Sequence, residues 1–316
     1  MTTTTVQVRD GFHRGPERAP ENRAFAAARR ATGGPASDPA TNIHDDSTAQ
    51  KLGFKGGTIA GSIHMDQFVP VLLDVFGERW FESGSLSLAF RNATISGEPV
   101  VAMVGEIGDE IDVDRDSVQV PVRMERPDGE LVAEGTASVG DPVVPTHLGA
   151  IDMRPAEDPT TLRILGGVRS GDPLPGHDVT LDPAHLRARI DAGALTEPID
   201  WYTGSSPWGG PVANPSTMVQ LLRNRPGDFG PHVAEAVGLF GAIEVRHHHG
   251  PILFGDAYRV EGEVVAVGSS PRTEYVWYDT RAFDGDERLV ASMRMQLRWM
   301  TASSPLYADR SNGSEG

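Results

Sequence analysis

The sequence has no cysteine among its 316 residues. This excludes disulfide bonds, zinc–thiolate sites and cysteine nucleophiles. It also lacks a run of about 18 apolar residues, the length that a membrane-spanning helix requires. Residues 1–10 are rich in threonine and lack the apolar core of a signal peptide. We therefore expect a cytoplasmic protein without membrane contact.

Basic residues are fewer than acidic residues, and Lys51 and Lys55 are the only lysines. The net charge of −16 disfavours binding to nucleic acid or to an anionic membrane. The glycine-rich segments match neither phosphate-binding pattern, G-x-x-x-x-G-K-[ST] or G-x-G-x-x-G, so we expect no nucleotide cofactor. The segment 204–206 is not a G-x-S-x-G elbow, which argues against a serine hydrolase.

The apolar residues that are present follow one pattern twice. They are dense on all sides between Thr58 and Phe76, which predicts a long buried helix. Alternating segments then predict strands, and a second helix from about residue 214 is followed by four more strands. The expected strands cover 85–90, 100–106, 112–125 and 131–139, and then 238–246, 257–267, 273–283 and 289–300.

Three landmarks recur at nearly one offset. The Asp-Gly turn at 128–129 returns 156 positions later, the helix entry at 59–61 returns 153 positions later, and Gly97 has a counterpart 158 positions later. This spacing predicts an internal duplication. A twisted antiparallel sheet that curls around an apolar helix is the hot-dog fold. We therefore predict an α+β double hot-dog, with two long helices each wrapped by an antiparallel β-sheet.

The predicted organisation is a flexible arm over 1–37, a first domain over 38–150, a second over 151–302 and a disordered tail over 303–316. The two domains form a pseudo-dimer within one chain, with a homodimer as a further possibility. Substrate clefts in such a pseudo-dimer form between the two halves.

One segment carries a recognisable motif. Residues 41–46 read T-N-I-H-D-D and residues 52–61 read L-G-F-K-G-G-T-I-A-G. They resemble the signature of MaoC-like (R)-specific enoyl hydratases, D-x-N-P-[IL]-H-x-D followed by G-F and by an I-A-H-G helix start. The resemblance extends over about residues 38–300, and residues 201–215 repeat the motif in degenerate form.

The resemblance implies a lyase that hydrates or dehydrates an α,β-unsaturated acyl thioester, carried on coenzyme A or an acyl carrier protein. It implies His44 as general base with Asp38 as its carboxylate partner. It also places the backbone N–H of Ser62 at the thioester oxygen, with Gly61 in the position of the signature histidine. Further candidates for substrate contact are Asn42, His64 and Tyr202.

Two departures from the signature leave alternatives open. Pro39 stands where the signature places its aspartate, and Thr41-Asn42 replaces the N-P pair. Asp38 can serve after a slip of one residue, in which case its carboxylate should lie about 4–6 Å from the His44 ring. Otherwise Asn42 replaces it, or hydration has been lost. The alternatives are a non-catalytic acyl-binding protein and a pocket that takes a specialised metabolite.

Several motifs have a structural explanation that we favour. Asp45 and Asp46 are expected to cap a short helix that continues through Gln50. The run at 247–249 contains three histidines, but neighbouring residues of a strand point to opposite faces, so we expect no metal site there. His44 itself has a structural alternative to catalysis, which is to brace its loop.

Overall fold

The computed structural model describes residues 6–33, 42–108, 110–153 and 159–307. Its centre is one eleven-stranded antiparallel sheet in the order β1-β2-β4-β5-β6-β3-β8-β11-β10-β9-β7. The strands are β1 Gln7–Arg9, β2 Phe12–Arg14, β3 Gly84–Phe90, β4 Val101–Gly105, β5 Val118–Glu125, β6 Leu131–Val139, β7 Pro173–Thr180, β8 Gly238–His247, β9 Ala257–Ser269, β10 Thr273–Phe283 and β11 Leu289–Met300.

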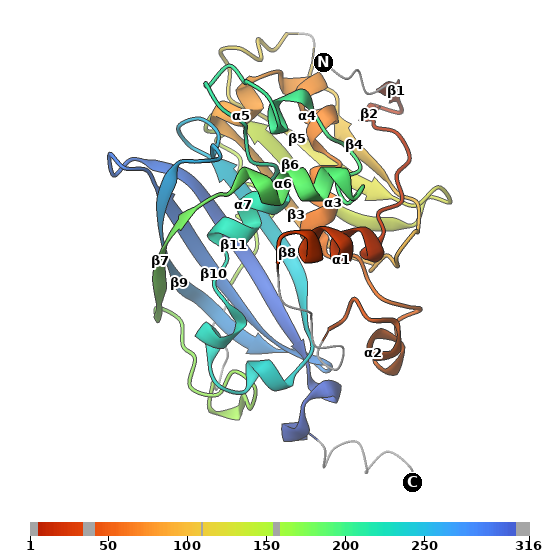
Figure 1. The fold of residues 1–316 in the computed structure, drawn as a ribbon, viewed down its shortest axis with the longest axis vertical. Helices are drawn as coiled ribbons and strands as arrows, with labels where there is room; N and C mark the ends of the chain where they lie inside the picture. The colour runs from red at the N-terminus through yellow and green to blue at the C-terminus, as the bar shows by residue number, and fades with distance from the viewer. Residues whose placement is uncertain (1–5, 34–41, 109, 154–158, 308–316) are drawn as a thin grey trace.

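The two predicted units meet edge to edge in this sheet. Strand β3 of the first unit pairs with β8 of the second, with Ser87 opposite Glu244. Figure 1 shows the short first half and the long strands β9, β10 and β11 of the second half as one continuous sheet. The pairing covers Ser85–Ala89 of β3 and Ala242–Arg246 of β8, so these segments present no open edge that could template aggregation. The fold is the predicted double hot-dog arrangement, while the division at residue 150 stays a prediction.

The helices lie mainly over the middle of the sheet, where α1, α3, α6 and α7 gather (Figure 1). Their bounds are α1 Asn22–Ala31, α2 Asp46–Lys51, α3 Gly61–Asp66, α4 Val69–Phe76, α5 Arg79–Ser83, α6 Pro183–Asp191 and α7 Pro215–Leu222. Short 3-10 turns cover Pro159–Thr161, Asp200–Tyr202, Pro226–Phe229, Val233–Glu235, Thr301–Ser303 and Pro305–Tyr307. Among the described residues, no helix combines the length and apolar character needed to cross a membrane.

The first central helix is shorter than the sequence predicts. Its apolar run is divided into α3 and α4 by a turn at Gln67 and Phe68. Pro70 explains the break, because it cannot donate to the carbonyl of Asp66 and its ring would clash there. The second central helix, α7, has eight residues and ends at Leu222. Both helices still bury their apolar residues against the sheet.

The N-terminal segment is structured, which corrects the expectation of a flexible arm over 1–37. Strands β1 and β2 form a hairpin, and β2 extends the first sheet by pairing with β4. Helix α1 packs against α6 of the second unit. The tail is also ordered further than predicted, since the ring of Tyr307 stacks under Arg163 and its hydroxyl donates to Glu274. Residues 308–316 lie outside the described residues.

A buried polar network joins the two units on the helix side. Asp66, the last residue of α3, accepts the backbone N–H of Ser216 (2.8 Å) and its hydroxyl (2.6 Å) at the start of α7. Arg189 of α6 donates to the same carboxyl group (3.0 Å). Burial raises the pKa of Asp66, while the ion pair with Arg189 and the bonds from Ser216 act in the opposite direction. The carboxyl group therefore caps the second central helix from within the first unit.

We expect Asp66→Ala to destabilise the protein by about 3–5 kcal/mol, because it leaves Arg189 buried without its anionic partner. The exposed pair Arg115–Asp112 provides the control, and Arg115→Ala should cost less than about 1 kcal/mol. Urea unfolding of both variants measures the difference. Equal losses would show that the buried network does not hold the units together.

Candidate active site

One pocket of about 250 Å³ lies at the junction of the two units. The first unit contributes the loop around His44, the start of α3 and the segment that follows β3, and the second unit contributes β8 and the end of β11. The residues around the pocket are Ile43, His44, Phe54, Thr58, Ile59, Ala60, Gly61, His64, Phe90, Arg91, Asn92, Ala93, Thr94, Val132, Gly238, Leu239, Phe240, Gly241 and Arg298. This location agrees with a cleft between the two halves.

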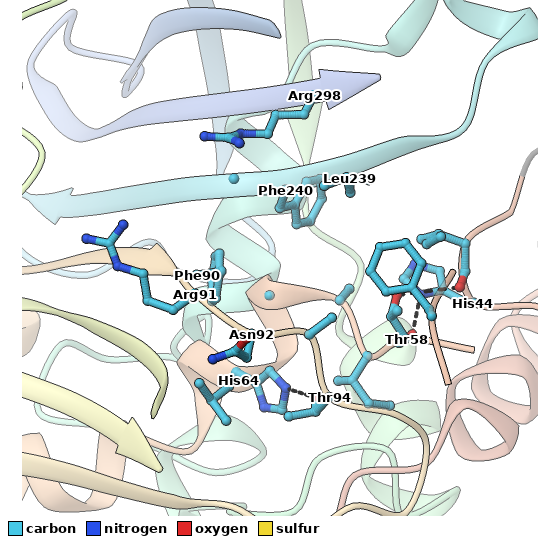
Figure 2. A pocket seen from close by; sticks show the side chains of 18 of the residues that line it. His44, Thr58, His64, Phe90, Arg91, Asn92, Thr94, Leu239, Phe240 and Arg298 are labelled. Atoms are coloured by element: carbon cyan, nitrogen blue, oxygen red, sulfur yellow. Dashed lines mark hydrogen bonds between the residues drawn. The ribbon is translucent and has the colours of Figure 1, made fainter. Parts of the chain in front are cut away.

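His44 is accessible from the pocket, and one of its ring nitrogens is already committed. Nδ1 lies 2.6 Å from the backbone carbonyl oxygen of Thr58 (Figure 2). A carbonyl oxygen can only accept, so Nδ1 carries the proton and Nε2 of the neutral ring keeps its lone pair. Burial is the main cause that lowers the pKa of His44 below its usual value, and the positive charge of Arg223 adds to it. The bond to Thr58 opposes this shift. His44 is therefore a neutral imidazole with a fixed tautomer at pH 7.

The loop that carries His44 is held by several backbone contacts. The Asn22 amide, at the start of α1, donates to the carbonyl oxygens of His44 (3.3 Å), Gly57 (3.2 Å) and Thr58 (3.2 Å). Position 57 needs glycine, because a Cβ atom there would lie 2.2 Å from the His44 carbonyl oxygen. No motif marked Asn22, which the sequence analysis assigned to a flexible arm.

Of the two aspartates after His44, Asp45 caps the short helix as expected, whereas Asp46 does not cap it and binds a different segment. Asp45 caps α2 by accepting the backbone N–H of Thr48 (3.0 Å). Asp46 accepts the backbone N–H of Gly57 (2.7 Å), which ties α2 to the segment that leads into α3. Both carboxyl groups thus fix the loop.

The start of α3 forms part of the same pocket. Gly61 is its first residue, and its backbone N–H together with that of Ser62 belongs to the turn whose N–H groups have no helical partner. Gly61 borders the pocket, whereas Ser62 lies one position beyond the residues that do. A Cβ atom at 61 would lie 2.4 Å from the Phe90 ring. This explains the departure from the signature histidine, because Phe90 fills the space that such a side chain would take.

His64 lines the pocket but is only 2% exposed. Its Nε2 lies 2.6 Å from the Thr94 hydroxyl, and Nδ1 faces the amide nitrogen of Gln67 at 3.4 Å. Burial, with a smaller contribution from Arg126, lowers the pKa of His64 to about 4. His64 is therefore a neutral part of the pocket wall, with both ring nitrogens engaged.

The remaining candidates from the signature lie in different places. Asn42 uses its side-chain oxygen to accept the backbone N–H of His44 (3.1 Å), so it orders the loop. It borders a neighbouring cavity that also contacts His44. Asp38 lies outside the described residues, and its distance from the His44 ring stays a prediction.

Backbone hydrogen bonds reveal the equivalent site in the second unit. Thr58 donates its N–H to the Ile43 carbonyl (3.0 Å), and Val212 donates to the Trp201 carbonyl (2.9 Å). The next residues repeat the match, with Ile59 bonded to Thr94 and Ala213 bonded to Ile252. These repeated bonds support the duplication and place Tyr202, the residue after Trp201, in the position of His44.

The second site is closed. Tyr202 is 2% exposed and packs in the main core, which corrects the prediction that it contacts substrate. The helix start is closed as well, because Pro215 has no N–H and the Ser216 N–H is bonded to Asp66. The Asp66 carboxyl group occupies the position that a substrate oxygen would need.

The three histidines of the run at 247–249 contact different groups. His247 is buried against the rings of Trp80 (centroids 5.3 Å apart) and Phe81 (5.7 Å). His248 and His249 bond instead to Ser292 and to the Leu289 carbonyl. In the described part of the chain, no three His, Cys, Asp or Glu side chains are grouped to hold a metal ion.

No protein-family model matches the sequence, and no curated protein matches it. Solved structures show similarity in fold. A MaoC domain protein from Chloroflexus aurantiacus J-10-fl, named as a dehydratase, superposes with a TM-score of 0.62 at 16% identity, over 94% of each chain. A conserved hypothetical protein from Mycobacterium tuberculosis, described as a double hot-dog, has a TM-score of 0.58 at 14% identity, over 95% of this chain and 97% of that one. A MaoC-like dehydratase has a TM-score of 0.52 at 15% identity, over 90% and 97%.

These comparisons confirm the double hot-dog fold predicted from the motif and the duplication. At sequence identities of 14–16%, these similarities show the fold and no more.

We expect Gly61→Ala to destabilise the protein by about 1–3 kcal/mol, because the new methyl group must displace the Phe90 ring. Adding Phe90→Ala should remove this cost, so that the double variant is no less stable than Phe90→Ala alone. Gly210→Ala is the control, since its methyl group would meet open space. Urea unfolding of the four variants measures the coupling, and additive losses would contradict the close packing.

Proposed function

We propose that the protein hydrates an α,β-unsaturated acyl thioester, or catalyses the reverse dehydration, in the pocket between its two units. The observation that carries the proposal is that His44, with its Nε2 lone pair free to act as a base, borders the same pocket as the open start of α3. These are the two groups that the reaction needs, a base for water and donors for the thioester oxygen.

Each step follows from these two groups. The thioester oxygen accepts the N–H groups at Gly61 and Ser62. His44 Nε2 takes a proton from water as the water oxygen bonds to the β-carbon, and the electron pair of the double bond moves toward the thioester oxygen. The helix start stabilises this enolate. The imidazolium then returns the proton to the α-carbon, which regenerates the neutral base. Dehydration runs through the same steps in reverse.

The Thr58 carbonyl supplies part of what a carboxylate partner would provide. It fixes the ring orientation and the tautomer, and it stabilises the imidazolium through the Nδ1–H bond at 2.6 Å. A single imidazole supported in this way can both remove the proton and deliver it.

Two arginines support a phosphate-bearing carrier, either coenzyme A or an acyl carrier protein. Arg91 and Arg298 border the pocket, and Figure 2 shows their guanidinium groups on the side away from His44. Arg298 bonds to the neutral side chain of Gln296 (2.8 Å), and burial lowers its pKa, with Arg91 adding to the effect. Arg91 also forms an ion pair with Glu134 (2.7 Å), so the positive charge that favours an anion here, such as the phosphate groups of a carrier, comes mainly from Arg298.

A second candidate is acyl binding without turnover. One observation favours it: the described residues around the pocket include no aspartate or glutamate. Hydration with one imidazole is then slower than with a carboxylate partner, unless Asp38 provides one. Asp38→Asn separates these cases, since an unchanged turnover number shows that His44 works without it. Tight thioester binding with no turnover by the wild type supports the binding protein.

His44→Ala should lower kcat/KM for short trans-2-enoyl thioesters of coenzyme A by about 10²–10⁴-fold without lowering the thermal unfolding temperature. The exposed His185, outside the pocket, is the matched control, and His185→Ala should leave kcat/KM unchanged.

The pH profile tests the role of His44 independently. Because the base must be neutral and its pKa is lowered, wild-type kcat/KM should be constant above about pH 6.5 and fall as pH drops through the lower pKa. An equal loss of stability and activity in His44→Ala would instead support a bracing role.

A further inference from the structure

A second cavity, of about 310 Å³, lies beyond His44 as seen from the substrate pocket. The two spaces share His44, Gly238, Leu239 and Phe240. The second cavity is largely apolar and is built from β8, β10, β11 and the segment after α7. Its other residues are Asn42, Arg223, Asn224, Pro226, Val233, Ala234, Ala236, Tyr278, Met295, Leu297 and Trp299. The two cavities adjoin at these residues, so an acyl chain that has its thioester at α3 and passes between them would enter this space.

Arg223 is the one guanidinium group among the described residues around this second cavity. Within the described part of the chain, its side chain has no hydrogen bond or ion pair. The acidic residue closest along the chain, Asp228, is engaged by the Asn224 amide (3.3 Å) and the backbone N–H of Arg225 (2.8 Å).

The side chain of Arg223 is exposed and borders the second cavity, and the groups that act on its charge are cationic or neutral. Desolvation by the surrounding protein is the main cause that lowers its pKa, and the positive charge of Arg29 lowers it further. The nearby polar group Tyr278 is neutral at pH 7, as tyrosine ordinarily is, and burial raises its pKa further; its hydroxyl donates to the Met295 sulfur (2.9 Å). An exposed guanidinium group that borders a cavity without an acidic partner is available to bind the anion of a ligand.

We propose that Arg223 binds a carboxylate at the far end of the acyl group, so that the site selects thioesters whose acyl part carries a second acid. This inference rests on the proposed thioester site. The planar guanidinium fork matches a carboxylate with two parallel bonds. Neutral acyl chains of the same length cannot form this ion pair, which gives the site its discrimination.

The proposed contact between Arg223 and a carboxylate also affects the base, His44. The positive charge of Arg223 disfavours protonation of His44. A carboxylate bound to Arg223 offsets that charge, so the imidazolium formed during the reaction is less destabilised when the correct acyl group is present.

Calorimetry that measures the binding of saturated coenzyme A thioesters tests the inference without any turnover. Matched pairs of about four to six acyl carbons, such as glutaryl and pentanoyl, differ only in the terminal carboxylate. The wild type should bind the dicarboxylic member at least ~30-fold more tightly in the pair whose length spans the two cavities. Arg223→Gln should abolish this preference without weakening the binding of the neutral member.

Arg225→Gln is the matched control, because Arg225 is exposed and does not border either cavity. It should keep the wild-type preference, and both variants should unfold at the wild-type temperature. Equal binding of both members by the wild type, at every length, would overturn the inference, as would an equal loss for both members in Arg223→Gln.

The outcomes separate this inference from the proposed reaction. A carboxylate preference lost in Arg223→Gln, together with no turnover of enoyl thioesters, supports Arg223 and refutes hydration. Turnover of enoyl thioesters without any carboxylate preference supports hydration and refutes the role of Arg223.

Discussion

The arrangement depends on one buried carboxyl group. Asp66 ends α3 in the first unit and accepts two hydrogen bonds from Ser216 at the start of α7 in the second, while Arg189 pairs with it from α6. This contact joins the units on the helix side, as the β3–β8 pairing does in the sheet. It also occupies the start of α7, so the duplicated architecture has one closed helix start and one open helix start, at Gly61.

The open site in turn depends on segments that are far apart in the sequence. Asn22 holds three carbonyl groups of the His44 loop, and the Thr58 carbonyl fixes the imidazole tautomer. The second unit completes the pocket with Leu239 and Phe240. The protein around His44 lowers its pKa, and the positive charge of the unpaired Arg223 adds to this shift. The chemistry and the selectivity that we propose therefore arise from the same junction.

Local patterns predicted eight of the eleven strands, because alternation and Asp-Gly turns are short-range signals, but they did not predict β1, β2 and β7. The predicted strands 131–139 and 273–283 coincide with β6 and β10. The prediction of one long helix was wrong at Pro70, because this proline interrupts the helix within an otherwise apolar run. His44 was identified by its motif, whereas Tyr202 was misassigned because a repeated motif does not reveal which copy is buried. Asn22 had no local signal, since its role comes from contacts across the fold.

The central claim is that His44 and the start of α3 act on the two ends of one enoyl thioester unit. A crystal structure of the protein with a bound 3-hydroxyacyl thioester tests this most directly. We predict that the 3-hydroxyl group lies within hydrogen-bond distance of His44 Nε2 and that the thioester oxygen faces the N–H groups of Gly61 and Ser62. A thioester bound away from the α3 start, or a hydroxyl group out of reach of His44, would contradict the account.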